Sequence, residues 1–274
     1  MRNTFRIILI TLAAFGLYYL LQQLFFREIR HWFMQAGLNA GFSHLISYFI
    51  TGTPLFAAVL IIHGPKRFAE SLGLNKSVGK GFVFALLCTL PMLLGYALLF
   101  EFDREITFNQ VFMGAVVAAL IEELYFRAFL YGQLFRFTRL GFIPSVLAGA
   151  LLFASLHLYQ SNEFSTLTGI FITTFSGAVL FAWVMSEWQH NLWVPVFLHF
   201  FMNLFWMMFS AGDNALGGWY ANIFRAITIA LIIVITILYK RRSGERMEIN
   251  RETLWIKKRQ TFQPDGNATS RILD

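Results

Sequence analysis

The chain has 274 residues, of which 57% are hydrophobic, 18% aromatic and only 14% charged. Soluble domains average about 45–50% apolar and about 25% charged residues, so this composition argues against a soluble protein and for a membrane protein. The net charge is +7, and the stretch YKRRSGERMEINRETLWIKKRQ near the C-terminus is rich in Lys and Arg. No nucleic-acid-binding motif accompanies this stretch, which favours a tail beside anionic lipid and no nucleic-acid partner.

Apolar segments long enough to cross a bilayer recur along most of the chain. A crossing helix needs about 20 residues, and the sequence predicts about eight such helices. The predicted fold is therefore an all-α polytopic bundle over residues 1–240. The predicted spans are 6–26, 42–63, 80–100, 108–135, 141–160, 164–186, 190–210 and 219–239.

The first predicted span follows Arg2 and Arg6, as the apolar region of a secretory signal peptide would. No cleavage site of small residues follows LITLAAFGLYYLLQQLFF, so we expect a permanent anchor instead.

Basic residues gather on one side of the predicted spans, which indicates the cytoplasmic side. The other side receives mainly Arg27, Arg30 and Arg104. We therefore predict that both termini are cytoplasmic and that residues 241–274 form a basic cytoplasmic tail, in a multi-pass protein of the cell membrane. Asn267 begins a glycosylation sequon that would be idle on this side. The basic residues on the cytoplasmic side are Arg2, Arg6, Lys66, Arg67, Lys76, Lys80, Arg136, Arg139, Lys240, Arg241 and Arg242.

A small set of polar side chains lies inside the predicted spans. Ionisable groups there are costly to insert and generally face a partner or a water-filled cavity. Measured from the cytoplasmic ends of their spans at about 1.5 Å per residue, they lie at similar depths of roughly 15 to 22 Å. We therefore predict one polar pocket lined by three helices. The residues are Glu122, Glu123 and Arg127 in the fourth span, His157 at the end of the fifth, and His199 and Asn203 in the seventh.

Helical spacing suggests different tasks for these residues. Glu123 and Arg127 are four residues apart with the acid first, so they can neutralise each other on one helix face. Glu122 points about 100° away and is left to act as a general base. His199 and Asn203 are also four residues apart. Their imidazole can shuttle a proton or bind a metal, and the amide can stabilise an oxyanion.

Each motif by itself also has a purely structural interpretation. Glu123 and Arg127 could be an ion pair that fixes helix packing, and His157 could be an interfacial side chain. His199 and Asn203 could form hydrogen bonds between helices. The common depth of the groups favours a functional site over these interpretations.

Three motifs follow one another on separate apolar segments: EELYFR, FASLH and HFFMN. They resemble the EExxxR, FxxxH and HxxxN motifs of the CAAX protease and bacteriocin-processing family (CPBP, or Abi), which are intramembrane proteases. The resemblance covers residues from about 80 to 210, which we take as the protease core. It implies a bundle of eight membrane helices and an endopeptidase that hydrolyses membrane-associated or lipidated peptides.

The resemblance also implies a role for each motif residue. Glu122 would activate a water molecule for attack on a peptide carbonyl, assisted by His157. His199 and Asn203 would lie at the reacting carbonyl, with Asn203 as the oxyanion donor.

Glu123 and Arg127 would support the site. From the depth of the site and the predicted orientation, we expect the cavity to open to the cytoplasm, and the compact size and basic tail fit a prokaryotic relative of the family.

The sequence leaves open whether a metal takes part. Glu122, His157 and His199 are the ligands that a divalent metal such as zinc would take, with one position open for water. Glutamate and histidine chemistry without a metal uses the same residues. The lack of an HExxH motif and the amide of Asn203, a poor zinc ligand, favour the second mechanism. No cofactor is certain from the sequence.

Two other functions fit a polar pocket in a membrane bundle. A non-proteolytic scaffold or bacteriocin-immunity protein of the same fold would bind a partner without cutting it. A transporter would relay protons through the acids and histidines, but the chain shows no repeat symmetry. The preferred partners are the bilayer and a membrane peptide or lipidated protein as substrate, and the sequence leaves the oligomeric state unknown.

Overall fold

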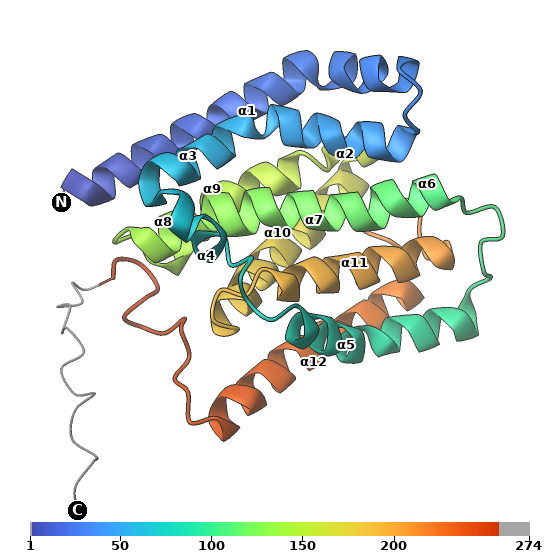
Figure 1. The fold of residues 1–274 in the computed structure, drawn as a ribbon. Coiled ribbons are helices and arrows are strands. Elements are labelled where there is room, and N and C mark those ends of the chain that lie inside the picture. Colours follow the sequence, from blue (N-terminus) through green and yellow to red (C-terminus); the bar gives the residue numbers. More distant parts are fainter. Residues whose placement is uncertain (1, 258–274) are drawn as a thin grey trace, which may run out of the picture.

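The computed structural model describes residues 2–257, shown in colour in Figure 1. All regular elements in this part of the chain are helical, and the only extended pairing there is an isolated bridge between Leu140 and Ile256. The predicted all-α class is therefore confirmed. Asn267 and the rest of the predicted tail beyond Lys257 lie outside the described residues.

The helices follow one another with short connections. In chain order they are α1 (Arg2–Gln35), α2 (Ala40–Thr51), α3 (Thr53–His63), α4 (Phe68–Ser71), α5 (Val78–Leu99), α6 (Phe108–Val111), α7 (Ala118–Glu122), α8 (Gly132–Phe137), α9 (Phe142–Ser155), α10 (Phe164–Glu187), α11 (Trp193–Met208) and α12 (Trp219–Arg242). Short 3-10 turns, η1 (Pro65–Arg67) and η4 (Leu158–Gln160), follow α3 and α9. Two π-helical segments, η2 (Phe112–Val117) and η3 (Glu123–Tyr131), join α6, α7 and α8 into one helical run.

Five helices in this part of the chain are long and apolar enough to cross a membrane: α1, α5, α9 together with η4, α10 and α12. The pair α2 and α3 passes the same test as a single span bent by 44°, which raises the number to six. The chain is therefore a multi-pass membrane protein. The other two predicted spans correspond to the α6–α8 run and to the shorter apolar helix α11. The number of eight spans and the cytoplasmic location of both termini stay predictions.

The α6–α8 run lies in the middle of the bundle (Figure 1). Helices α1, α2, α3, α9, α10 and α11 all contact it. Helices α5 and α12 pack against each other beyond α11. Every residue of η3 is buried, so this part of the central run is enclosed by protein.

Large apolar side chains cover the outside of this arrangement. Leu20, Leu98 and Ile172 are exposed, as are many other leucines, isoleucines and phenylalanines. Exposing such a surface to water would be unfavourable, whereas in a bilayer it contacts lipid. The backbone hydrogen bonds are formed within the helices, as a lipid environment requires.

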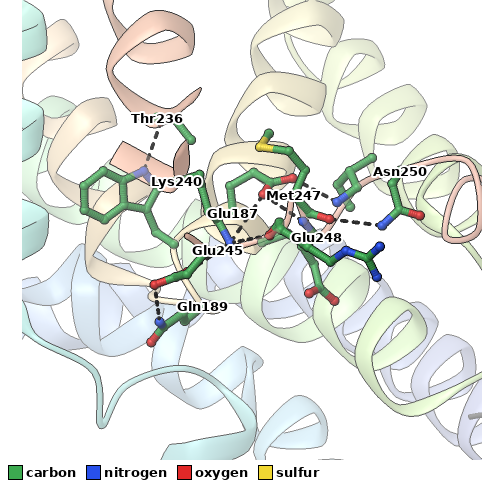
Figure 2. Close-up of polar contacts among 12 residues, drawn as sticks. Glu187, Gln189, Thr236, Lys240, Glu245, Met247, Glu248 and Asn250 are labelled. Carbon is green, nitrogen blue, oxygen red and sulfur yellow. Dashed lines mark hydrogen bonds and ion pairs between the residues drawn. The ribbon is translucent and has the colours of Figure 1, made fainter. Parts of the chain in front are cut away.

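Residues 243–257, which we call the C-terminal strap, fold back against the bundle (Figure 2). The buried carboxylate of Glu187, at the end of α10, accepts the backbone N–H groups of Glu248 and Ile249, both at 2.9 Å. Lys240 Nζ lies 3.7 Å from the same carboxylate and 3.3 Å from that of Glu245. The first part of the predicted tail is thus attached through the buried carboxylate of Glu187, which also pairs with Lys240 of α12.

The end of the strap caps the N-terminus of α9. Helix termini leave backbone N–H groups without partners inside the helix, and α9 has no side-chain cap. Pro144, the third residue of α9, has no N–H to satisfy. The strap provides acceptors for the other free N–H groups. Gly141, Phe142 and Ile143 donate to the carbonyl groups of Trp255, Thr253 and Leu254 at 2.6, 2.7 and 2.9 Å.

The strap comes so close to this turn that only glycine fits at position 141. A Cβ atom on Gly141 would lie 2.5 Å from the carbonyl carbon of Leu254. Thr4, Phe5 and Ile256 line one shallow apolar cavity, so the start of α1 and the end of the strap lie at the same end of the bundle.

We expect Glu187→Gln to release the strap. The substitution leaves the buried ammonium of Lys240 with one partner fewer, and breaking a buried ion pair costs about 3–5 kcal/mol. Limited trypsin digestion of the purified protein in detergent should cut sooner after Arg246 and Arg251, and thermal unfolding should begin earlier. Glu245→Gln is the matched control, because the Glu245 side chain is 31% exposed and its loss should have a much smaller effect. Equal digestion of wild type and Glu187→Gln would contradict this account.

Candidate active site

The candidate site lies where the central run changes from α to π geometry. Glu122 is the last residue of α7, and Glu123 is the first residue of η3. π turns, in which the hydrogen bonds span five residues, are rare and concentrate at functional sites. The two acids have different surroundings: the side chain of Glu122 is 27% exposed, whereas that of Glu123 is fully buried.

Glu123 is held by two partners on different helices. Its Oε2 lies 3.1 Å from Nε of Arg127, so the ion pair expected from the spacing is formed. Its Oε1 lies 2.8 Å from Nδ1 of His199 on α11. The guanidinium of Arg127 also stacks over the ring of Phe153, 4.2 Å from its centroid. Glu123 therefore joins the central run, α9 and α11 through one buried charge.

The hydrogen bond to Glu123 determines which ring nitrogen of His199 is free to accept another hydrogen bond. A carboxylate oxygen needs a donor, so Nδ1 carries the hydrogen and Nε2 of the neutral ring is an acceptor. Nε2 lies 3.9 Å from Oε2 of Glu122. That oxygen is buried and has no hydrogen-bond partner within residues 2–257. Two acceptors thus face each other at a distance that one water molecule can bridge.

Glu122 also borders a cavity of about 250 Å³. His157 lies in the wall of the same cavity, at the end of α9. Its Nδ1 is 2.7 Å from the carbonyl oxygen of Phe153, so Nδ1 donates there and Nε2 is left as an acceptor. The cavity is lined by Tyr18, Gln22, Tyr48, Ile121, Glu122, Tyr125, Phe126, Phe153, Leu156, His157 and Tyr159.

Asn203 lies one turn after His199 on α11 and contacts the backbone of the central run. Its Nδ2 donates to the carbonyl oxygen of Gly114 in η2 at 2.9 Å. One of its two N–H groups therefore holds α11 against η2, and the second can donate a hydrogen bond elsewhere. Asn203 is not among the residues that line the cavity beside Glu122.

The structure thus brings the predicted residues together in two ways. Glu123 contacts Arg127 and His199 directly, while Glu122 lies 3.9 Å from His199 and shares the cavity with His157. Within the described residues, no group of three His, Cys, Asp or Glu side chains is placed to hold a metal ion. Glu122, His157 and His199 therefore do not fit a three-ligand zinc site in this geometry, and no step below is routed through a metal.

Residues 104–205 match the family model of the type II CAAX prenyl endopeptidases, Rce1-like. The match confirms the family resemblance that the three motifs indicated. The matched residues, hereafter the Rce1-like segment, run from the loop before α6 to near the end of α11 and include every candidate residue named above. Comparisons with curated proteins and with solved structures give no significant match.

Several polar residues of the cavity were missed by sequence reasoning. Tyr18 and Gln22 lie on α1 and Tyr48 lies on α2, outside the Rce1-like segment. The sequence could have indicated Tyr18 and Gln22, because these polar residues are four positions apart within a largely apolar span and so share one helix face. Tyr48 gave no such signal.

We expect Arg127→Ala to prevent most of the protein from folding. The substitution leaves Glu123 charged and buried, and removing one partner of a buried ion pair costs about 3–5 kcal/mol. The yield of monodisperse protein in size-exclusion chromatography and the unfolding temperature in detergent should both fall sharply. Arg104→Ala is a suitable control because Arg104 is exposed in the loop before α6. An unchanged yield and unfolding temperature for Arg127→Ala would show that Glu123 does not need this partner.

Proposed function

We propose that the protein is an intramembrane endopeptidase in which Glu122 activates a water molecule for attack on a peptide carbonyl. The supporting observation is the unpartnered, buried Oε2 of Glu122, which faces Nε2 of His199 at 3.9 Å beside a cavity. The match of the Rce1-like segment supports a protease of the CAAX type.

In this mechanism the bound water donates one hydrogen bond to Glu122 and another to Nε2 of His199. Glu122 accepts a proton as the water oxygen bonds to the carbonyl carbon, which produces a tetrahedral intermediate. The C–N bond then breaks, and the proton moves to the leaving nitrogen. The products are a carboxylic acid and an amine, so water is the only co-reactant.

The surrounding residues keep these groups in position. Glu123 accepts a hydrogen bond from Nδ1 of His199, which keeps the ring in one orientation with Nε2 free to accept from the water. His157 reaches the same cavity and assists Glu122 in moving the proton. The second N–H of Asn203 is the donor that we assign to the oxyanion, with the first held by Gly114.

The substrate in this proposal is a membrane-associated or lipidated peptide. Hydrolysis within a bilayer needs water and an extended backbone in a space that is lined by protein. The polar cavity between α1, α2 and the end of α9 meets this requirement. We propose that it opens to the cytoplasm of a prokaryotic cell, as the distribution of Lys and Arg suggests.

We expect Glu122→Gln to abolish cleavage while the protein stays folded. The amide is nearly isosteric with the carboxylate but cannot accept the proton, and a general base typically contributes about 10²- to 10⁴-fold to the rate. The test is cleavage of a panel of membrane peptides by purified protein in nanodiscs, analysed by mass spectrometry, together with the unfolding temperature. Glu105→Gln is the matched control, since Glu105 is an exposed acid in the loop before α6.

Equal cleavage by wild type and Glu122→Gln would exclude Glu122 as the base. Tight binding of a peptide that neither form cleaves would favour the scaffold or immunity protein instead.

We also expect cleavage to survive complete removal of metal ions. The physical reason is that Glu122, His157 and His199 do not gather as ligands in this geometry. The measurement is the cleavage rate before and after exhaustive treatment with a chelator, with metal content determined on the same samples. Loss of activity that added zinc restores would contradict this expectation.

A further inference from the structure

The cavity beside Glu122 has a second polar wall that belongs to none of the motifs. Tyr18 and Gln22 from α1 and Tyr48 from α2 form this wall. All three lie before the Rce1-like segment in the chain. The wall faces the cavity that the proposed function uses, so its hydrogen-bonding groups are candidates for contacts with the substrate.

Buried tyrosines elsewhere in the protein have partners for their hydroxyl groups. The hydroxyl of Tyr125 donates to the carbonyl of Tyr48 at 2.8 Å, and that of Tyr96 donates to the carbonyl of Ala221 at 3.1 Å. Tyr131 exchanges a hydrogen bond with Ser186 at 2.6 Å. This is the usual situation, because a phenol that is removed from water generally keeps a hydrogen bond.

Tyr18, which is buried, departs from this pattern, and the half-buried Tyr48 resembles Tyr18. Neither hydroxyl makes a hydrogen bond to any other group in the part of the chain that the structure describes. The residue Tyr18 is only 3% exposed, so its ring is as deeply enclosed as a core side chain. Both residues line the cavity, which is therefore the place where their hydroxyl groups can find partners.

The two rings are held firmly by aromatic neighbours. Tyr18 packs edge-to-face on Phe15 and Tyr125, with centroids 5.4 and 4.9 Å apart. Tyr48 packs against Phe26 at 4.6 Å and His44 at 5.0 Å. Donors that are already fixed in position lose little conformational freedom when a ligand binds.

The chemistry of the ligand follows from the membrane setting. An extended peptide in the bilayer carries main-chain carbonyl groups with no partners, and each of them requires a donor from the protein. The phenol groups provide such donors. A ligand carboxylate suits the wall less well, because Glu122 borders the same cavity and would repel it.

We propose that Tyr18 and Tyr48 are substrate-binding residues that donate hydrogen bonds to main-chain carbonyl groups of an extended peptide. The peptide lies across the cavity between α1 and the end of α9, with the scissile bond at Glu122. This assignment rests on the proposed endopeptidase function and adds to it a binding wall formed by α1 and α2.

The test is steady-state cleavage of one membrane peptide by Tyr18→Phe and Tyr48→Phe, which remove only the hydroxyl oxygen. Each substitution should raise KM about 3- to 10-fold, the range expected for one hydrogen bond, and change kcat less than about twofold. The matched control is Tyr96→Phe, whose hydroxyl is bonded to the carbonyl of Ala221 between α5 and α12, away from the cavity. It should lower the unfolding temperature and leave KM unchanged. Because Tyr18 and Tyr48 lie on different helices, a folding defect in one variant leaves the other as a test.

Binding of the same peptide separates this proposal from the endopeptidase itself. Its affinity is measured by fluorescence anisotropy for protein that carries Glu122→Gln, with and without each tyrosine substitution. Weaker binding in the tyrosine variants supports the wall even if wild type cuts no peptide. Unchanged KM and unchanged affinity in both tyrosine variants would show that Tyr18 and Tyr48 do not bind the peptide, without contradicting the endopeptidase function. A protein that neither cuts nor binds any membrane peptide would overturn both.

Discussion

The buried carboxylate of Glu123 is the group on which the central packing depends. It has no access to solvent, and an unpaired charge at such a position would cost several kcal/mol. Arg127 neutralises it from the next turn of the same run, and His199 donates to it from α11. Because both partners are needed, the contact fixes how α11 lies against the central run and where Nε2 of His199 points.

Two adjacent acids thereby acquire different tasks from their surroundings alone. Successive residues on a helix point about 100° apart, so Glu123 faces the interior while Glu122 borders the cavity. The two carboxylate oxygens of Glu123 pair with Arg127 and His199, whereas Oε2 of Glu122 comes no closer than 3.9 Å to Nε2 of His199 and makes no hydrogen bond in the described chain. In a site that performs acid–base chemistry, such a difference between neighbouring carboxylates is what separates a supporting group from a reacting one.

The cavity depends on parts of the chain that lie far from the motifs. Helices α1 and α2 form its second wall, and His157 is presented by the end of α9. The start of α9 is capped by the C-terminal strap, which Glu187 and Lys240 anchor. Both described ends of the chain therefore contribute to the frame around the site, although the family match covers only residues 104–205.

The sequence by itself determined the helical membrane class, the family resemblance and the pairing of Glu123 with Arg127. These properties rest on composition and on local spacing, since groups four residues apart on a helix are neighbours. Only the tertiary structure decided that His199 bonds to Glu123 and Asn203 to Gly114, and that Tyr18 and Tyr48 face Glu122. It also showed Glu187 holding the strap. These contacts join distant parts of the chain, and spacing along one helix carries no information on how separate helices pack.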